Sequence, residues 1–245
     1  GTTINRIAKY NGTTWSQLGT NGLPGQVNAI AIDPATGNIY VGGAWKTILV
    51  GGLNGGGQSY YALDITTPES PILLWEFTNS NLGLSYGNPI IAKRADGTWV
   101  VALTSGYNNT AGDGMGHLFI VNANSGSLLL DISTGVGSSS NPSGLAKINA
   151  WIADSSDNTA LRYYGGDLLG NLWRFDVDNV VLPHQSAQLL ANFQTGTGTA
   201  LPITIPPRLK ELSGYPVVIV GTGRYLGTGD ITDTTTQTLA IFKDS

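Results

Sequence analysis

The sequence predicts an all-β protein, a β-propeller built from four-stranded antiparallel blades, and three observations lead to this prediction. The 34 glycines and 11 prolines divide the chain into short apolar runs rich in Val, Ile, Tyr, Trp and Leu, which is the pattern of strands joined by turns. No apolar period of about 3.6 residues lasts long enough for an ordinary helix. A strand, turn and strand unit recurs about every 45 residues, which is the usual length of a propeller blade.

The expected strands recur along the chain from residue 28 onwards. They cover residues 28–33, 38–41, 46–50, 60–65, 72–77, 99–104, 117–121, 127–132, 161–164, 171–177, 216–220 and 238–242. The best candidate for a helix lies around Ser186 to Phe193, but this stretch is short, and we interpret it as an outer strand.

Each repeat unit places a strand that ends in glycine before a second strand and a turn. The glycine-ending strands close at Gly52, Gly106, Gly166 and Gly223. A single blade cannot bury both of its faces, so the blades are expected to stack around a central axis. About four to five blades are visible in residues 45–245, and their texture is quinoprotein-like. Residues 1–44 form a separate segment of propeller-type strands, and Ile4 to Leu18 could supply an outer strand that closes the ring.

The composition excludes several classes of function. Charged residues make up 11% of the chain, against about 25% in an ordinary soluble domain, so Ser, Thr, Asn, Gln and Gly must form much of the surface. This composition favours an extracellular location. Cysteine is absent, which excludes disulfides and thiol chemistry. The net charge of −4 comes without a cluster of Lys and Arg, so we expect no nucleic-acid partner.

The sequence contains no feature of membrane insertion. No apolar run approaches the roughly 18 residues of a membrane-spanning helix. Residues Gly1 to Thr3 show no feature of a signal peptide. For an exported protein, the signal is therefore expected upstream of this sequence.

From Trp45 onwards the sequence resembles a known family. Trp45–Gly57 and Tyr61–Pro68 are similar to the opening of the C-terminal propeller of the PilY/PilC proteins of type IV pili. The similarity continues in register along the chain, and its longest blocks are Tyr164–Asp176 and Val220–Asp230.

This resemblance implies a surface-exposed protein of the pilus tip that supports pilus assembly, adhesion or twitching motility. The expected partners are minor pilins or other pilus proteins, together with a host or abiotic surface. The resemblance implies a binding and assembly module, not an enzyme, located outside the cell or on its surface. Family members usually carry a large variable adhesive region ahead of the propeller, whereas residues 1–44 alone precede the similar region here.

The resemblance also indicates one candidate metal site. Propellers of this family often carry a calcium loop just before the block that starts at Tyr164, and calcium prefers oxygen ligands. In this sequence the loop keeps Asp154, Asp157 and Asn158, while Leu161 replaces its last carboxylate. Asp and Asn side chains in a turn also cap their own backbone. We therefore expect an Asx-rich turn and no cofactor, with calcium at these three residues as the alternative.

Three other motifs favour structural roles. The stretch from Asn108 to Gly114 could hold a cation, but it lacks a bidentate carboxylate and is expected to be a hairpin loop. Gly51 to Gly57 lacks the helix and the Lys of a phosphate loop, so a turn is expected. His117 and His184 lie far apart in the sequence, which favours structural or solvated roles over a pair of metal ligands.

Repeated aromatic and acidic residues indicate packing. Trp75, Trp99 and Trp173 occupy repeated strand positions, and we expect them to pack between blades and not to bind carbohydrate. Asp167 and Asp176 flank Trp173, and both are expected to accept backbone N–H bonds at a turn.

Two alternatives to a pilus module stay open. Exposed strand edges could join neighbouring copies into an extracellular fibre. The repeated strands also resemble those of quinoprotein dehydrogenases, which bind a quinone and calcium, although the short length and the absence of adjacent cysteines count against this class. No Ser/His/Asp constellation and no pair of carboxylates stands out for catalysis.

Overall fold

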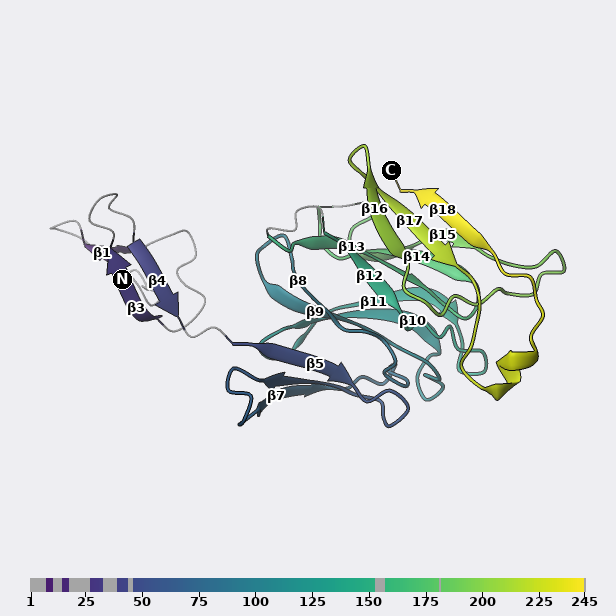
Figure 1. Ribbon diagram of the computed structural model, residues 1–245, viewed down its shortest axis with the longest axis horizontal. Helices are drawn as coiled ribbons and strands as arrows, with labels where there is room; N and C mark the ends of the chain where they lie inside the picture. The colour runs from purple at the N-terminus through teal and green to yellow at the C-terminus, as the bar shows by residue number, and fades with distance from the viewer. Residues whose placement is uncertain are drawn as a thin grey trace. The chain divides into compact units, whose positions relative to one another are not determined.

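The structure of the protein is a computed structural model (Figure 1). It describes residues 46–152, 157–180 and 182–244, and the backbone of four short strands within residues 8–43. These parts contain eighteen strands, one short 3-10 helix and no α-helix. Within them, no helix is long and apolar enough to cross a membrane. The prediction of an all-β fold is confirmed.

The chain forms two compact units, of which the first consists of residues 1–48 and 64–72. Its N-terminal strands pair as two antiparallel hairpins, β1 (Ala8–Tyr10) with β2 (Trp15–Gln17) and β3 (Val27–Ile32) with β4 (Ile39–Gly43). The predicted strands 28–33 and 38–41 are therefore confirmed. The predicted boundary between residues 44 and 45 lies outside the described residues, and closure of the ring by residues 4–18 stays a prediction.

Four antiparallel sheets follow one another along the rest of the chain (Figure 1). The first has three strands, β5 (Ile48–Gly52), β6 (Tyr60–Asp64) and β7 (Ile72–Phe77). The second has four, β8 (Ile90–Lys93), β9 (Trp99–Thr104), β10 (Met115–Asn122) and β11 (Leu128–Gly137). The third has four, β12 (Ile148–Ile152), β13 (Ala160–Gly166), β14 (Asn171–Asp176) and β15 (Ser186–Asn192). The fourth has three, β16 (Arg208–Leu212), β17 (Tyr215–Gly221) and β18 (Leu239–Lys243).

In each sheet the strands are hydrogen-bonded in chain order, which is the meander of a propeller blade. Every strand predicted from residue 46 onwards is present, and the stretch at Ser186 is the outer strand β15. Three strands of these sheets have no counterpart in the prediction, namely β8, β12 and β16, and each is the first strand of its sheet. They are short or mix apolar with charged residues, as in Arg208–Leu212. Such sequences lack the apolar alternation by which a strand is recognised.

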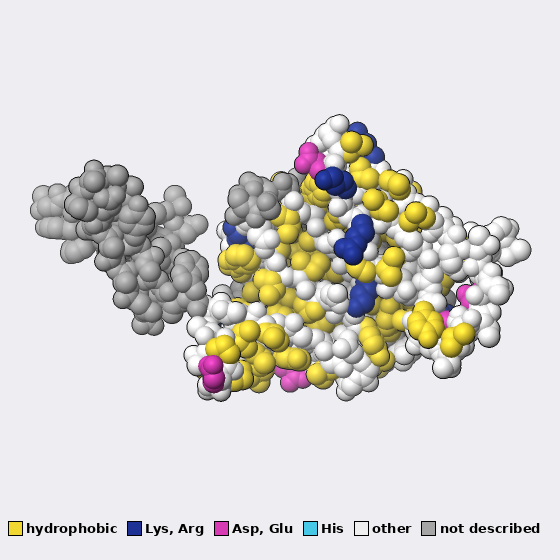
Figure 2. Space-filling view, in the orientation of Figure 1, with side chains coloured by type: hydrophobic (Ala, Val, Ile, Leu, Met, Phe, Trp, Pro, Cys, Tyr) yellow, Lys and Arg dark blue, Asp and Glu magenta, His cyan; other side chains and the backbone are white. Residues whose placement is uncertain are grey.

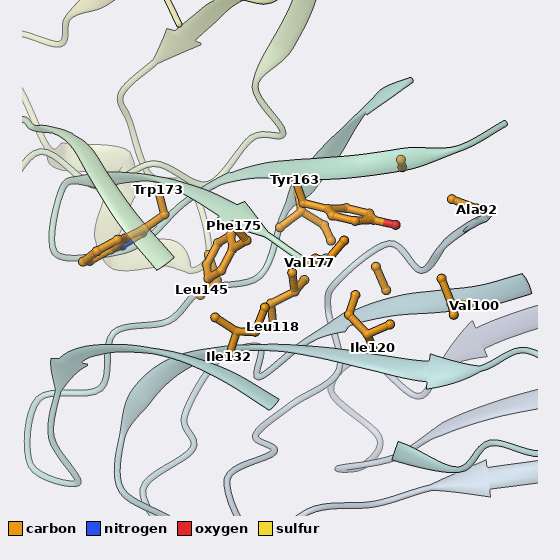
Figure 3. Packing of buried hydrophobic residues seen from close by; sticks show 13 residues of the cluster. Ala92, Val100, Leu118, Ile120, Ile132, Leu145, Tyr163, Trp173, Phe175 and Val177 are labelled. Carbon is orange, nitrogen blue, oxygen red and sulfur yellow. The ribbon is translucent and has the colours of Figure 1, made fainter. Parts of the chain in front are cut away.

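Neighbouring sheets share apolar cores. In one cluster, side chains of the second sheet such as Leu118 pack against side chains of the third sheet such as Phe175 (Figure 3). A second cluster joins the third sheet to the fourth through Tyr164, Leu172 and Val218, all at most 2% exposed. The sheets therefore stack face to face, as the blades of a propeller do.

The tryptophans divide between buried and exposed positions. Trp75 and Trp173 are 6% and 4% exposed, and Trp75 Nε1 donates a 2.9 Å hydrogen bond to the carbonyl of Ala123 in the second sheet's turn after β10. Packing between blades is thus confirmed for these two. It is wrong for Trp99, which is 46% exposed. Trp99 begins β9 at the margin of the sheet, and Nζ of Lys93 lies 5.6 Å from the centre of its ring.

Candidate functional site

In the second, third and fourth sheets, the loops that join the second strand to the third lie at one end of the blades, because successive meanders repeat the same strand directions. Backbone hydrogen bonds hold one of these loops in place. Leu84 N donates to Tyr107 O at 2.6 Å, Tyr107 N donates to Leu84 O at 3.1 Å, and Gly83 N donates to Ser105 O at 2.7 Å. These bonds fix the loop after β9 against the segment that leads into β8.

A cleft of about 560 Å³ opens among these loops. It is formed by the segment before β8, the loops after β9 and β17, and the turn after β13. Its rings and polar groups belong to Tyr86, Tyr107, Asn108, Arg224, Tyr225 and Asp230. The volume lies within the range of about 300–1,000 Å³ that is usual for small-molecule sites. We therefore treat this cleft as the candidate functional site of the described residues.

The loop after β17 is held by one carboxylate. Arg224 Nε donates to Asp230 Oδ1 at 2.7 Å, while Oδ2 accepts the backbone N–H groups of Leu226 at 2.8 Å and Gly227 at 3.1 Å. The backbone bond from Leu226, followed by Arg224, lowers the pKa of Asp230 from its ordinary value. An ionised Asp230 therefore fixes the loop and the short helix η1 (Thr228–Thr232) at the edge of the cleft.

Three tyrosines supply the aromatic surface of the cleft. The rings of Tyr86 and Tyr107 lie 5.6 Å apart at an interplanar angle of 47°. Burial, with a smaller effect of Tyr86, raises the pKa of Tyr107 to about 12, so its hydroxyl stays protonated and can donate. Tyr225 is 74% exposed and Leu226 is 50% exposed. The cleft thus offers aromatic rings together with hydrogen-bonding groups.

Sequence reasoning missed this site. The sequence predicts the block from Val220 to Asp230 only as a family motif, and it indicates no role for Tyr86 and Tyr107. These residues are far apart in the chain and meet because three successive blades present their loops at the same end. A periodic pattern predicts the blades, but it does not predict which loop side chains converge.

Two of the predicted calcium residues, Asp157 and Asn158, lie outside the cleft. Asp154 is outside the described residues. Asp157 Oδ1 accepts Thr159 N at 2.7 Å and Oδ2 accepts the Thr159 hydroxyl at 3.0 Å, while Asn158 has φ 62° and donates to Ile91 O at 3.2 Å. These bonds are those of an Asx turn. Calcium at Asp154, Asp157 and Asn158 stays a prediction, and the described residues include no group of three or more His, Asp or Glu side chains arranged to hold a metal.

In the second candidate cation loop, Asn108 to Gly114, the carboxylate of Asp113 is bound to protein groups. Asp113 Oδ1 accepts Met115 N at 2.8 Å, and Asp113 Oδ2 lies 3.0 Å from Nε2 of His117. Nδ1 of the same ring lies 2.6 Å from Asp131 Oδ1. His117 is 4% exposed, so it has the structural role expected of it, as a link between this loop and β11.

Asp167 organises the turn after β13. It is fully buried and accepts the backbone N–H groups of Leu169 at 3.0 Å and Asn171 at 2.9 Å, together with Nε1 of Trp173 at 2.9 Å. The prediction that Asp167 accepts backbone bonds is confirmed. For Asp176 it is wrong, because the hydrogen bonds that its carboxylate accepts from described residues come from the Arg174 side chain. Asp176 is the last residue of β14 and lies opposite Ser186 of β15.

Comparison with known proteins identifies the family. The family model described as the PilY1 beta-propeller domain matches residues 16–245. The chain belongs to this PilY1 beta-propeller family. The sequence-based resemblance to PilY/PilC propellers and the predicted propeller fold are confirmed by this match and by a solved structure.

Similar proteins of Pseudomonas aeruginosa and Xylella fastidiosa show the extent of the match. The chain is 29% identical over 243 residues to type IV pilus biogenesis factor PilY1 of P. aeruginosa strain UCBPP-PA14, covering 85% of the chain and 20% of that protein. It is 36% identical over 194 residues to a PilY1 homolog of X. fastidiosa strain Temecula1, covering 76% of the chain and 15% of that protein. The chain therefore spans about a fifth or less of these relatives.

The fold agrees with a crystal structure of the C-terminal domain of P. aeruginosa PilY1. The TM-score is 0.67 at 30% sequence identity, and the match covers 83% of the chain and 46% of that structure. The blades described above are thus similar to about half of the PilY1 domain.

Proposed function

We propose that the chain is the propeller module of a type IV pilus biogenesis factor and that it acts by protein contacts, without catalysis. The observation that carries the proposal is the family match over residues 16–245. The relatives are named as pilus biogenesis factors and not as enzymes. The proposed location is the cell surface or the pilus tip, with minor pilins as partners and with adhesion and twitching motility as the processes supported.

The surface of the described residues supports a role in contacts. Charged side chains are sparse on the face drawn in Figure 2, where uncharged side chains and backbone cover most of the described area. Strand β18 exposes Leu239 and Ile241, at 75% and 66%. The third strands β10 and β14 are paired on both sides, whereas β18 pairs among the described residues only with β17. Exposed apolar side chains of this kind suit contacts with a partner.

The proposal is tested on pili from cells that make the full-length protein. Pili sheared from the cells are purified through repeated sedimentation and probed for this protein and for minor pilins. We expect the protein to sediment with the pili and to be absent from the same fraction of a strain without pilin. A protein that stays wholly with the cells in both strains would contradict a place on the pilus.

A subunit of an extracellular fibre is the second candidate, and the exposed Leu239 and Ile241 of β18 would lie in its contacts. Light scattering of the purified protein at rising concentration distinguishes a monomer from a growing polymer. A polymer that is lost in the double variant Leu239→Lys and Ile241→Lys would favour the fibre. A constant molar mass would favour the pilus module.

A quinoprotein-type dehydrogenase is the enzymatic alternative. It predicts a visible absorbance after incubation with quinone and calcium, and oxidation of an alcohol. We expect neither, and either result would overturn the non-enzymatic proposal.

A further inference from the structure

We infer that the cleft at the loop end of the blades binds an acidic saccharide, a sugar whose ring carries a carboxylate. This inference goes beyond the proposed pilus contacts, because it assigns a small ligand to a site away from the β18 edge. It is based on the unused donors of Arg224, on the tyrosine rings and on the way in which the cleft is built.

The two terminal nitrogen atoms of Arg224 are available to a ligand. Its Nε is used by Asp230, and among the described residues no hydrogen bond is made by Nη1 or Nη2. The side chain is 47% exposed. The two nearby carboxylates do not use these nitrogen atoms. Asp230 accepts hydrogen bonds from Arg224 Nε and from two backbone N–H groups. Asp233 accepts Thr235 N at 2.9 Å and does not line the cleft. A guanidinium with two free nitrogen atoms matches a carboxylate, which accepts two parallel N–H bonds.

The rings suit a sugar. Tyr225 is exposed over most of its surface, and the lining also contains Tyr86, which is 36% exposed and forms a tilted ring pair with the buried Tyr107. A tyrosine ring offers an apolar face for the C–H side of a sugar ring and a hydroxyl for its oxygens. Asn108 adds an exposed amide to the same cleft. The ring faces and hydrogen-bonding groups of a sugar are thus both matched.

Two other ligand classes fit less well. A phosphate carries up to two negative charges, whereas Arg224 is the only cationic residue among the described residues that line the cleft. An extended peptide pairs with a free strand edge, but the lining comes from loops, and the backbones of Leu84 and Tyr107 already pair with each other. A compact ligand with one carboxylate is the class that the cleft matches best.

The test measures binding to the full chain by calorimetric titration. The acidic probe is a trisaccharide of β-1,4-linked glucuronate, and its neutral counterpart is cellotriose. We expect the acidic probe to bind at least about tenfold more tightly than the neutral one. We also expect Tyr225→Ala and Arg224→Met each to weaken its binding by about tenfold or more. The matched control is Tyr215→Ala, since Tyr215 is 42% exposed and lies outside the cleft.

The variants separate binding from folding. Arg224→Met also removes a partner of Asp230, whereas Tyr225→Ala leaves the bonds of Asp230 in place, so the second variant keeps the test decisive even where the first unfolds. The inference is overturned by the absence of saturable binding, by equal binding of both trisaccharides, or by full affinity in Tyr225→Ala. Preferential binding of inorganic phosphate or of an acidic peptide at Arg224 would overturn it as well. The two proposals can fail separately. If the protein binds the saccharide but is absent from purified pili, the result supports this inference and refutes only the pilus proposal.

Discussion

The hydroxyl of Tyr164 on β13 donates a 2.6 Å hydrogen bond to Oδ2 of Asp244, which follows β18. Oδ1 of the same carboxylate accepts Nη1 of Arg174 at 2.8 Å. Arg174 and Asp244 are both 7% exposed. A charged pair excluded from water therefore joins the third sheet to the fourth, next to the apolar cluster that the two sheets share.

Replacement of Asp244 tests this link. Asp244→Ala leaves the buried guanidinium of Arg174 with Asp176 as its charged partner and removes the acceptor of the Tyr164 hydroxyl. Loss of a hydrogen bond to a charged group costs about 1.5–3 kcal/mol. We expect a loss of this size in the free energy of unfolding measured with urea. The control is Asp64→Ala, whose partner Lys46 lies 3.9 Å away and is half exposed, so its effect should be much smaller. Equal effects of the two variants would contradict a special role of Asp244.

His117 makes the stability of the second sheet depend on pH. Burial lowers its pKa, but the hydrogen bonds and charges of Asp131 and Asp113 outweigh burial and raise the pKa above the ordinary 6.5. The stabilisation is therefore complete below the unfolded-state pKa and is lost as the pH rises through the folded-state pKa.

We expect the difference in unfolding free energy between the wild type and His117→Gln to shrink from about pH 6 to about pH 9. Urea titrations of both proteins at each pH provide the measurement. A difference that is constant over this range, or that grows with pH, would show that His117 is not held as a cation.

Gly106 tests the packing at the cleft, and Gly97 is its control. Gly106 has φ +70°, and a Cβ there would collide with the carbonyl oxygen of Leu84. Gly97 has φ +82° but open space around it. We expect Gly97→Ala to cost about 1 kcal/mol through its backbone conformation alone, and Gly106→Ala to cost at least about 2 kcal/mol more. Thermal or urea unfolding measures both, and similar losses would mean that the loops at the cleft are not fixed against each other.

Calcium removal tests the loop at Asp157. Both carboxylate oxygens of Asp157 are bound to Thr159, and Leu161 cannot be a ligand, so we expect the same unfolding temperature in calcium and in EGTA. A fall of several degrees in EGTA that is abolished by Asp157→Ala would establish the alternative, a calcium site at Asp154, Asp157 and Asn158.

The blades could be predicted from the sequence because their second and third strands are apolar enough to be recognised alone. The first strands of the second, third and fourth sheets could not, since β16, for example, has Arg208, Lys210 and Glu211 among its five residues and is a strand because it pairs with β17. The buried carboxylate of Asp167 was predictable from its place at a glycine turn. The roles of Trp99 and Asp176 were not, because repeat position does not specify whether a side chain faces the neighbouring sheet or the solvent.

The cleft could not be predicted for a similar reason. Arg224 and Tyr86 belong to different blades, and only the stacking of the sheets brings them to one opening. Its chemistry depends on which nitrogen of Arg224 is used by Asp230, and that is a property of the folded loop.

The central claim is that this propeller serves pilus biogenesis, and surface piliation tests it most directly. The gene is deleted in frame and restored with the wild-type sequence or with Asp244→Ala, and surface pili are sheared and quantified against total pilin. We predict that deletion sharply lowers surface pili, that the wild-type gene restores them and that Asp244→Ala restores them less well. Surface pili at the wild-type level in the deletion strain would contradict the claim.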